Sequence, residues 1–326
     1  MDHELDILMP YDIEKAVNSS IAVIAVRPET NKIDYESVII QAVKEYGNPV
    51  YMANLNGVLL KHKAVVIGHY TCQFQFAAEA KYGMRGYPEM IEAFEKKFKH
   101  DFNSAKIIGS LEAVKNYQDE IGLSSEELFD LMVPYEDFLE MYGHTVKKYR
   151  DFFIVDYDIP AILRRYSDST NILIVAIAMN DAGMQLNTLN RAIYENFCAN
   201  GVIKIIDSAK RVNMRWFDQV RRTYHISHNH IEAMFDLKDY VFTEDKNSIG
   251  FSDTPLGRKI FESSGMSKQE FEKKILNFKN NPLQYVTSGG VKRLAYLINE
   301  GVKFNNDGIE ELSIAECCDL LSSIEY

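Results

Sequence analysis

The sequence predicts an α/β protein with two different sheets. Up to about Ile108 the expected elements follow the order β-α-β-β-α-β, which is typical of a ferredoxin-like α+β domain. From Phe152 onward, apolar strands alternate with helices, the pattern of a mostly parallel, doubly wound, Rossmann-like sheet. We therefore expect a ferredoxin-like domain over residues 1–110, a helical connector over 111–150, and a parallel α/β domain with a helical C-terminus over 151–326.

Four strands and two helices are expected in the first domain. Ser20–Val26 is rich in β-branched residues, which favours a buried strand. Gly47 would end a helix that begins near Asp34. Pro88–Lys99 carries apolar residues at helical spacing, which predicts the second helix. The other strands are expected at Val50–Asn54, Ala64–Tyr70 and Ala105–Ile108.

The connector and the second domain are predicted from helix signals and apolar runs. Leu111–Tyr149 reads as wholly helical, with a capping-box start at Ser124 and a proline start at Pro134. The strands that follow are almost continuously apolar, as expected when helices cover both faces of a sheet. These strands are Phe152–Asp156, Asn171–Asp181 and Val202–Asp207, and helices are expected at 161–166, 186–198, 209–223, 267–278, 291–301 and 314–322.

Composition and charge predict a globular protein of the cytoplasm that does not bind long nucleic acid. In a chain of 326 residues, 46% hydrophobic and 25% charged residues are typical of a globular protein. The net charge of −11 opposes binding of long nucleic acid, which requires clustered Lys and Arg. The 4 cysteines show no C-x-x-C spacing, which predicts a reduced, cytoplasmic protein. The N-terminus does not resemble a signal peptide and no apolar run is long enough to cross a bilayer, so no membrane partner is expected.

Acidic residues follow each predicted strand of the second domain. The carboxyl ends of parallel strands line the crevice where ligands bind, so these acids would meet at one edge. Convergent carboxylates bind Mg²⁺ or Mn²⁺, and such an ion orients a phosphate or activates water. We predict Asp156, Asp158 and Asp207 as metal ligands and catalytic groups, and Asp181 as a ligand-binding residue. The alternative interpretation is that these acids cap the helices that follow.

Basic and histidine residues adjoin this set in the sequence. Arg211 and Arg215 fall on one face of a predicted helix and would bind an anionic ligand through paired hydrogen bonds. Tyr224–His230 contains three histidines, of which His228 is the candidate for acid–base catalysis. Their spacing matches no strong zinc motif. The alternative interpretation of the arginines is a solvated helix face paired with acids.

A second anion site is predicted in the first domain. Gly83–Pro88 leads directly into a helix whose first N–H groups attract anions, and Arg85 and Gly86 would complete the site by charge and close backbone approach. The alternative is a turn that needs its two glycines.

Two classes of function are consistent with these patterns. The first is an enzyme acting on a phosphorylated or otherwise anionic small molecule, assisted by a metal, with catalytic groups at Asp156, Asp158, Asp207 and His228. The second is a ligand-binding or assembly protein that has no metal and whose ferredoxin-like domain supports a homo-oligomer. A nuclease for long nucleic acid is favoured by the basic helix but opposed by the overall acidity.

Overall fold

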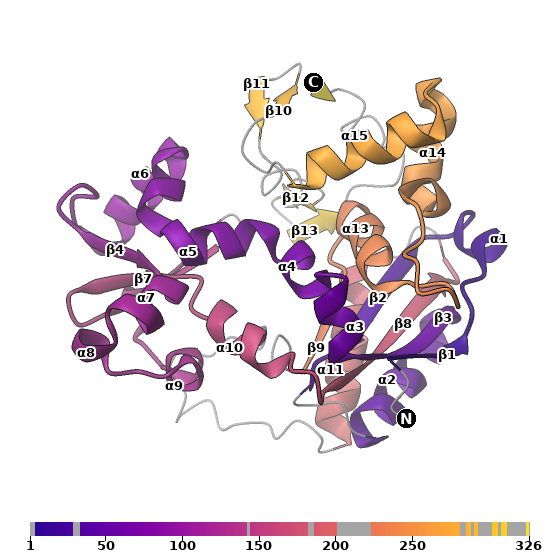
Figure 1. Cartoon of the computed structure of the whole chain (residues 1–326), viewed down its shortest axis with the longest axis horizontal. Coiled ribbons are helices and arrows are strands. Elements are labelled where there is room, and N and C mark those ends of the chain that lie inside the picture. Colours follow the sequence, from indigo (N-terminus) through magenta and orange to yellow (C-terminus); the bar gives the residue numbers. More distant parts are fainter. Residues whose placement is uncertain are drawn as a thin grey trace. The chain divides into compact units, whose positions relative to one another are not determined.

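The computed structural model describes most of the chain in two compact units (Figure 1). It describes residues 4–28, 33–141, 144–181, 186–200, 223–280, 285–287, 290–292, 302–305, 308–311 and 324–325. Unit 1 comprises the described residues within Met1–Val65, Asp168–Ile205 and Trp216–Tyr326. The described residues of unit 2 lie within Val66–Ser167.

Unit 1 is built on a five-stranded sheet, sheet A, in the order β1-β3-β8-β2-β9. Every neighbouring pair in this sheet is antiparallel. Its strands are β1 (Leu5–Met9), β2 (Ile21–Val26), β3 (Gly47–Asn56), β8 (Asn171–Met179) and β9 (Tyr224–Ile226). The sheet therefore joins strands from both halves of the sequence.

The mostly parallel sheet predicted for the second half is not confirmed, because sheet A is antiparallel and, among the described strands, β7 (Phe152–Val155) pairs in parallel only with β4 (Lys106–Gly109). β8 was expected to pair in parallel, but it lies between β3 and β2 and is antiparallel to both. The continuous apolar run in β8 reflects burial on both faces, and an antiparallel strand covered on both sides has the same composition.

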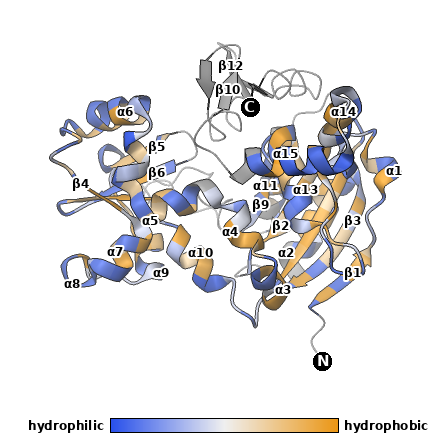
Figure 2. Cartoon of the chain, turned by 45° about the horizontal axis from the view of Figure 1, so that its top comes forward, coloured by the Kyte–Doolittle hydropathy of each residue, from blue (hydrophilic) through white to orange (hydrophobic). Residues whose placement is uncertain are grey.

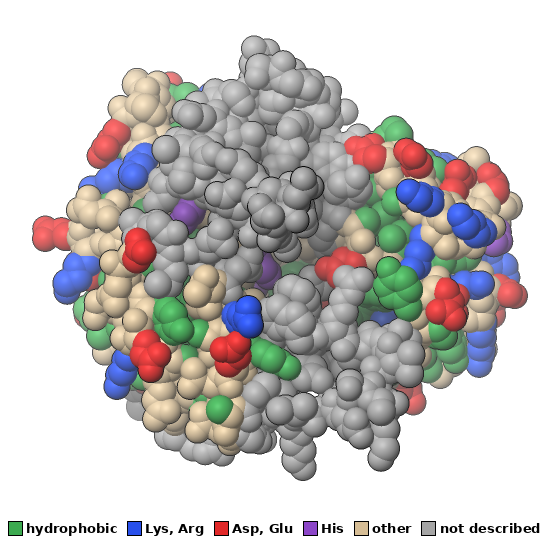
Figure 3. All heavy atoms as spheres, turned by 180° about the vertical axis from the view of Figure 1, so that it is seen from behind, with side chains coloured by type: hydrophobic (Ala, Val, Ile, Leu, Met, Phe, Trp, Pro, Cys, Tyr) green, Lys and Arg blue, Asp and Glu red, His purple; other side chains and the backbone are tan. Residues whose placement is uncertain are grey.

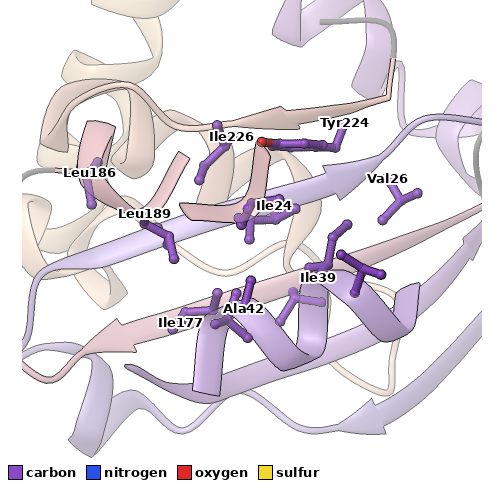
Figure 4. Packing of buried hydrophobic residues seen from close by; sticks show 14 of the residues in the cluster. Ile24, Val26, Ile39, Ala42, Ile177, Leu186, Leu189, Tyr224 and Ile226 are labelled. Carbon is purple, nitrogen blue, oxygen red and sulfur yellow. The ribbon is translucent and has the colours of Figure 1, made fainter. Parts of the chain in front are cut away.

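Helices α2 (Ile33–Tyr46) and α11 (Leu186–Ala199) pack on one face of sheet A. Figure 4 shows Ile39 and Ala42 of α2 directed toward Ile24 of β2 and Ile177 of β8. The alternate residues of β2, such as Val23, are buried as well, so both faces of the strand are covered. Burial of each isoleucine side chain stabilises the folded state by about 1.5–3 kcal/mol relative to an exposed one. Figure 2 shows the strands of this sheet mainly in hydrophobic colours.

The rest of unit 1 consists of short helices and strands. Helix α13 (His230–Tyr240) packs against β2 and positions the candidate site described below. The other helices are α1 (Ile13–Ala16), α3 (Gly57–His62), η3 (Phe251–Asp253), α14 (Pro255–Ser264) and α15 (Lys268–Asn280). The remaining strands are β10 (Tyr285–Thr287), β11 (Gly290–Lys292), β12 (Val302–Asn305), β13 (Gly308–Glu311) and β14 (Ile324–Glu325).

Unit 2 contains a four-stranded mixed sheet, sheet B, in the order β4-β7-β6-β5. β4 and β7 are parallel, and the other two pairs are antiparallel. Its strands are β4 (Lys106–Gly109), β5 (Phe138–Met141), β6 (His144–Tyr149) and β7 (Phe152–Val155). Phe153 of β7 packs against Phe94 and Phe98, with ring centroids 4.8 Å and 4.9 Å away.

The other elements of unit 2 are helices, of which α5, α6, α7 and η2 contact sheet B. They are α4 (Val65–His69), α5 (Thr71–Arg85), α6 (Pro88–Phe98), α7 (Ser110–Asn116), α8 (Gln118–Ile121), α9 (Ser125–Asp130), η2 (Tyr135–Asp137) and α10 (Ile159–Arg165). Within the described part of the chain, no helix combines the length and apolarity needed to cross a membrane.

Several predicted elements are confirmed. These are the strands at β2, β3, β4, β7 and β8, and the helices at α2, α6, α10, α11 and α15. The ferredoxin-like arrangement is not confirmed, because β2 and β3 belong to sheet A whereas β4 belongs to sheet B. Ala64–Tyr70 was expected to be a strand but forms helix α4. The connector was expected to be wholly helical but contains β5 and β6.

Other predicted elements fall outside the described residues. They are the strand Val202–Asp207, nearly all of the helix at 209–223, the helix at 314–322 and most of the helix at 291–301, whose first two residues belong to β11.

Candidate acid–base site at the start of helix α13

Two of the strand-end acids, Asp156 and Asp181, follow strands of different sheets. Asp156 follows β7 of sheet B in unit 2, whereas Asp181 follows β8 of sheet A in unit 1. Asp207 lies outside the described residues. The parallel pairing that was expected to bring these acids together is therefore not found among the strands that the structure describes.

Asp156 belongs to a hydrogen-bond network inside unit 2. Its Oδ2 lies 2.7 Å from Nδ1 of His144, and its Oδ1 accepts the Thr145 N–H at 3.0 Å. Ser110 Oγ donates to its backbone carbonyl at 2.5 Å, and the Phe76 ring stacks on His144 at 4.0 Å. Burial raises the pKa of the Asp156 carboxyl, and the neighbouring His144 offsets only part of that effect. Both carboxylate oxygens are thus already engaged within the core.

The other predicted site residues lie at separate places in the described parts of the chain or fall outside them. Asp158 is half-buried at the N-cap of α10 and its side chain makes no capping hydrogen bond. Asp181 is exposed. Arg85 is exposed at the end of α5, and it has no ion pair within the described residues. The Gly86 N–H already donates to Gly83 at 3.1 Å, so this amide is not directed at an anion. Arg211 and Arg215 lie outside the described residues.

His228 lies at the start of α13 and is held by an acid on the first turn of that helix. Asn229 caps the helix by accepting the N–H groups of Ile231 and Glu232, both at 3.0 Å. The Glu232 carboxylate reaches back to the His228 backbone N–H at 2.7 Å and to its Nδ1 at 2.7 Å. This reciprocal capping follows from an acid at the third helical position. The His228 side chain is 43% exposed, whereas that of Glu232 is 16% exposed.

A second histidine and a second acid repeat this pairing one helical turn further. His225 Nε2 lies 2.8 Å from Asp236 Oδ2, and the Ser227 hydroxyl donates to the same oxygen at 2.7 Å. Ser227 Oγ also accepts the Val23 N–H at 3.1 Å, which ties the acid to sheet A. Asp236 is fully buried and the His225 side chain is 10% exposed. Residues four apart share one helix face, so Glu232 and Asp236 both point toward the histidines.

The two histidines, His225 and His228, and the two acids, Glu232 and Asp236, influence one another electrostatically. The His225 and His228 ring centroids are 6.3 Å apart. Burial acts to raise the pKa of Glu232, but the charge and hydrogen bond of His228, aided by His225, lower it below its ordinary value despite the nearby Asp236. Glu232 is therefore a carboxylate at neutral pH, and it holds the His228 ring with Nδ1 as the donor.

This geometry supports proton transfer at His228. A carboxylate on Nδ1 fixes the tautomer and orientation of the ring, so that Nε2 is the nitrogen able to take or give a proton. A serine nucleophile of the triad type is not indicated, because Ser227 is buried and donates to Asp236 instead of to a histidine.

The sequence predicted His228 but not its partners. Glu232 and Asp236 could have been found from the helix signal itself, since an acid three residues after an N-cap Asn is a capping-box pattern and Asp236 follows at one further turn. Comparison of the chain with protein-family models, with curated proteins and with solved structures finds no match.

Proposed function

We propose that the chain is an enzyme in which His228 acts as a general acid–base group on a small anionic molecule. One observation carries this proposal. A half-exposed imidazole is hydrogen-bonded at 2.7 Å to a largely buried carboxylate, Glu232. The carboxylate of Glu232 orients the ring, and the exposed side of the ring is accessible to a substrate. These are the two requirements for proton transfer to a substrate.

The neighbouring groups strengthen this proposal physically. The ionised Glu232 stabilises the imidazolium that forms when His228 takes a proton. The backbone on both sides of His228 is held in place, because Asn229 caps α13 and Ser227 accepts the Val23 N–H of sheet A. A positioned acid–base group of this kind contributes about 10²–10⁴-fold to rate.

The anionic substrate class is supported by the sequence. Arg211 and Arg215 precede β9 closely in the chain, and arginine binds phosphate oxygens through two parallel hydrogen bonds. A metal held by Asp156, Asp158 and Asp207 has less support, because the Asp156 carboxylate is already bonded to His144 and Thr145.

The test is hydrolysis of chromogenic anionic and neutral esters by the full chain. The panel contains p-nitrophenyl phosphate, bis(p-nitrophenyl) phosphate and p-nitrophenyl acetate. His228→Gln should lower kcat by about 10²–10⁴-fold. His62→Gln, an exposed histidine of α3, is the matched control and should leave kcat unchanged.

Two results would contradict the proposal. The first is a His228→Gln protein with wild-type kcat. The second is a wild-type protein that hydrolyses none of the three esters. Stabilisation by inorganic phosphate in a thermal-shift assay without any turnover would then favour the ligand-binding alternative.

A further inference from the structure

We infer that unit 2 is a domain inserted into the turn of a β-hairpin of unit 1, and that it folds and unfolds as a unit of its own. The described residues of unit 2 occupy one continuous stretch, Val66–Ser167, whereas unit 1 takes residues from both sides of this stretch. Strand β3 precedes the stretch, and β8, the neighbour of β3 in sheet A, follows it. The inference is independent of the chemistry proposed for His228.

The strands β3 and β8 are paired in the way that the two strands of a hairpin are paired. They are antiparallel, and their register runs from Gly47 opposite Met179 to Asn56 opposite Asn171. Neighbouring antiparallel strands can be joined by a turn of about two residues. Here the last pair of the ladder is separated by 115 positions in the chain. The long connection is therefore not needed to pair the two strands.

Unit 1 holds the two ends of the inserted stretch together with its own residues. The Gly57 N–H donates to the Thr170 carbonyl at 2.7 Å, and the Asn56 side-chain amide donates to Asn171 Oδ1 at 3.0 Å. All four residues belong to unit 1. A loop whose ends lie this close is the kind of position at which a protein accepts an inserted domain without disturbing its own sheet.

Each unit has a hydrophobic core that is formed by its own residues. In unit 2, Ile154 of β7 is buried together with Ile108 of β4 and Leu128 of α9. In unit 1, Ile24 of β2 and Ile177 of β8 are buried in the cluster that includes α2 and α11. A continuous stretch of about 100 residues with its own sheet and core has the size of an ordinary domain. Unit 2 therefore meets the physical requirements for folding by itself.

The test is native-state hydrogen exchange of the full chain, followed by mass spectrometry at increasing urea concentrations. Ile154→Ala and Ile177→Ala are matched variants, because each removes a fully buried isoleucine from an interior strand of its sheet. Ile154→Ala should speed exchange of the most protected amides of β4 and β7 by at least about 30-fold. The protected amides of β3 and β8 should change by less than about 2-fold. Ile177→Ala should give the reverse pattern.

A spread of the effect from either variant into both units overturns the inference, because a single cooperative unit loses protection everywhere at once. If an alanine variant fails to fold, Ile154→Val and Ile177→Val remove only one methyl group each. They should speed exchange by about 2–10-fold, again within one unit alone. The measurement does not depend on activity, so its failure leaves the kcat test of His228 standing, and wild-type kcat in His228→Gln leaves the inserted domain standing.

Discussion

Two of the carboxylate–histidine pairs in the described residues, one in unit 2 and one in unit 1, are formed through the same ring nitrogen but differ in access to solvent. In unit 2, His144 Nδ1 lies 2.7 Å from Asp156, and the two side chains are 1% and 2% exposed. In unit 1, His228 Nδ1 lies 2.7 Å from Glu232, and the histidine side chain is 43% exposed. The bond is the same in length and in the ring nitrogen used. Pairing therefore orients a histidine, but exposure decides whether the histidine can meet a substrate.

The backbone explains why the first pair is buried. Asp156 has φ of 51°, in the left-handed region that few residues other than glycine, Asn and Asp adopt. This conformation turns the chain after β7 so that the carboxylate faces β6 and reaches Thr145 and His144. His228, by contrast, directly precedes the capped first turn of α13, and its ring remains accessible to solvent there.

The largest effect is expected from removal of the buried acid. Asp156→Ala leaves His144 without its partner in the core and places alanine in a left-handed conformation, so the free energy of unfolding should fall by about 3–5 kcal/mol. Urea denaturation followed by circular dichroism measures the loss. Asp156→Asn tolerates the same backbone conformation and should lose less. A loss below about 1 kcal/mol for the alanine variant would mean that the His144–Asp156 pair contributes little to the stability of the core.

A pH-dependent effect of intermediate size is expected from His230, two residues from His228. Burial, aided by the charge of Lys259, lowers the pKa of His230 from its ordinary 6.5 to about 4. The unfolded chain then takes up a proton at higher pH than the folded chain. The stabilisation of the folded state by neutral His230 is fully present above about pH 6.5. It is lost as the pH drops toward 4, and the free energy of unfolding is lower by about 2 kcal/mol at pH 5.

Urea denaturation at pH 7 and pH 5 measures this dependence. His230→Gln should lose less stability between the two pH values than the wild type does, whereas His62→Gln should follow the wild type. Identical pH dependence in the His230 variant would show that the buried histidine is not the titrating group.

A smaller effect on stability is expected from the partner of the exposed histidine. Glu232→Gln keeps the shape of the capping side chain but removes its charge near the helix N-terminus and beside His228, which should cost about 1 kcal/mol. The same variant should lower kcat on the ester panel, because the imidazolium loses its counter-charge. A variant with lower stability and unchanged kcat would restrict Glu232 to capping.

The smallest effect is expected at Asp158. This acid is half-buried at the N-cap of α10 and makes no capping hydrogen bond through its side chain. Asp158→Asn should change the free energy of unfolding by no more than about 0.5 kcal/mol, and kcat should stay the same. A large loss of activity would return the catalytic role to the end of β7.

The sequence predicted where β8 lies but not which way it pairs. An apolar run such as Asn171–Met179 reports burial on both faces, and burial is independent of strand direction. Ala64–Tyr70 was misassigned because its valines and isoleucine favour a strand, whereas the fold places them in α4 after a left-handed turn at Ala64.

The candidate site was predictable only in part. The sequence singled out His228 because three histidines in seven residues are conspicuous. The pairing of His228 with Glu232 depends on where α13 begins, and Asn229 sets that start. Asp156 was expected at an exposed strand end. A single left-handed residue directs it inward instead, and sequence patterns carry little information about one such dihedral angle.

The pairing of β3 with β8 has a consequence for folding during synthesis. The amide pairs Asn48–Asn180 and Asn56–Asn171 join residues 132 and 115 positions apart. The ribosome therefore releases two apolar strands of sheet A long before their central partner exists. The residues of unit 2 between β3 and β8 form one continuous stretch, Val66–Ser167. They can fold while β2 and β3 are still unpaired with β8. Such long-range antiparallel contacts slow folding and leave strand edges open, so nascent chains stalled before β8 should be the aggregation-prone species of this protein.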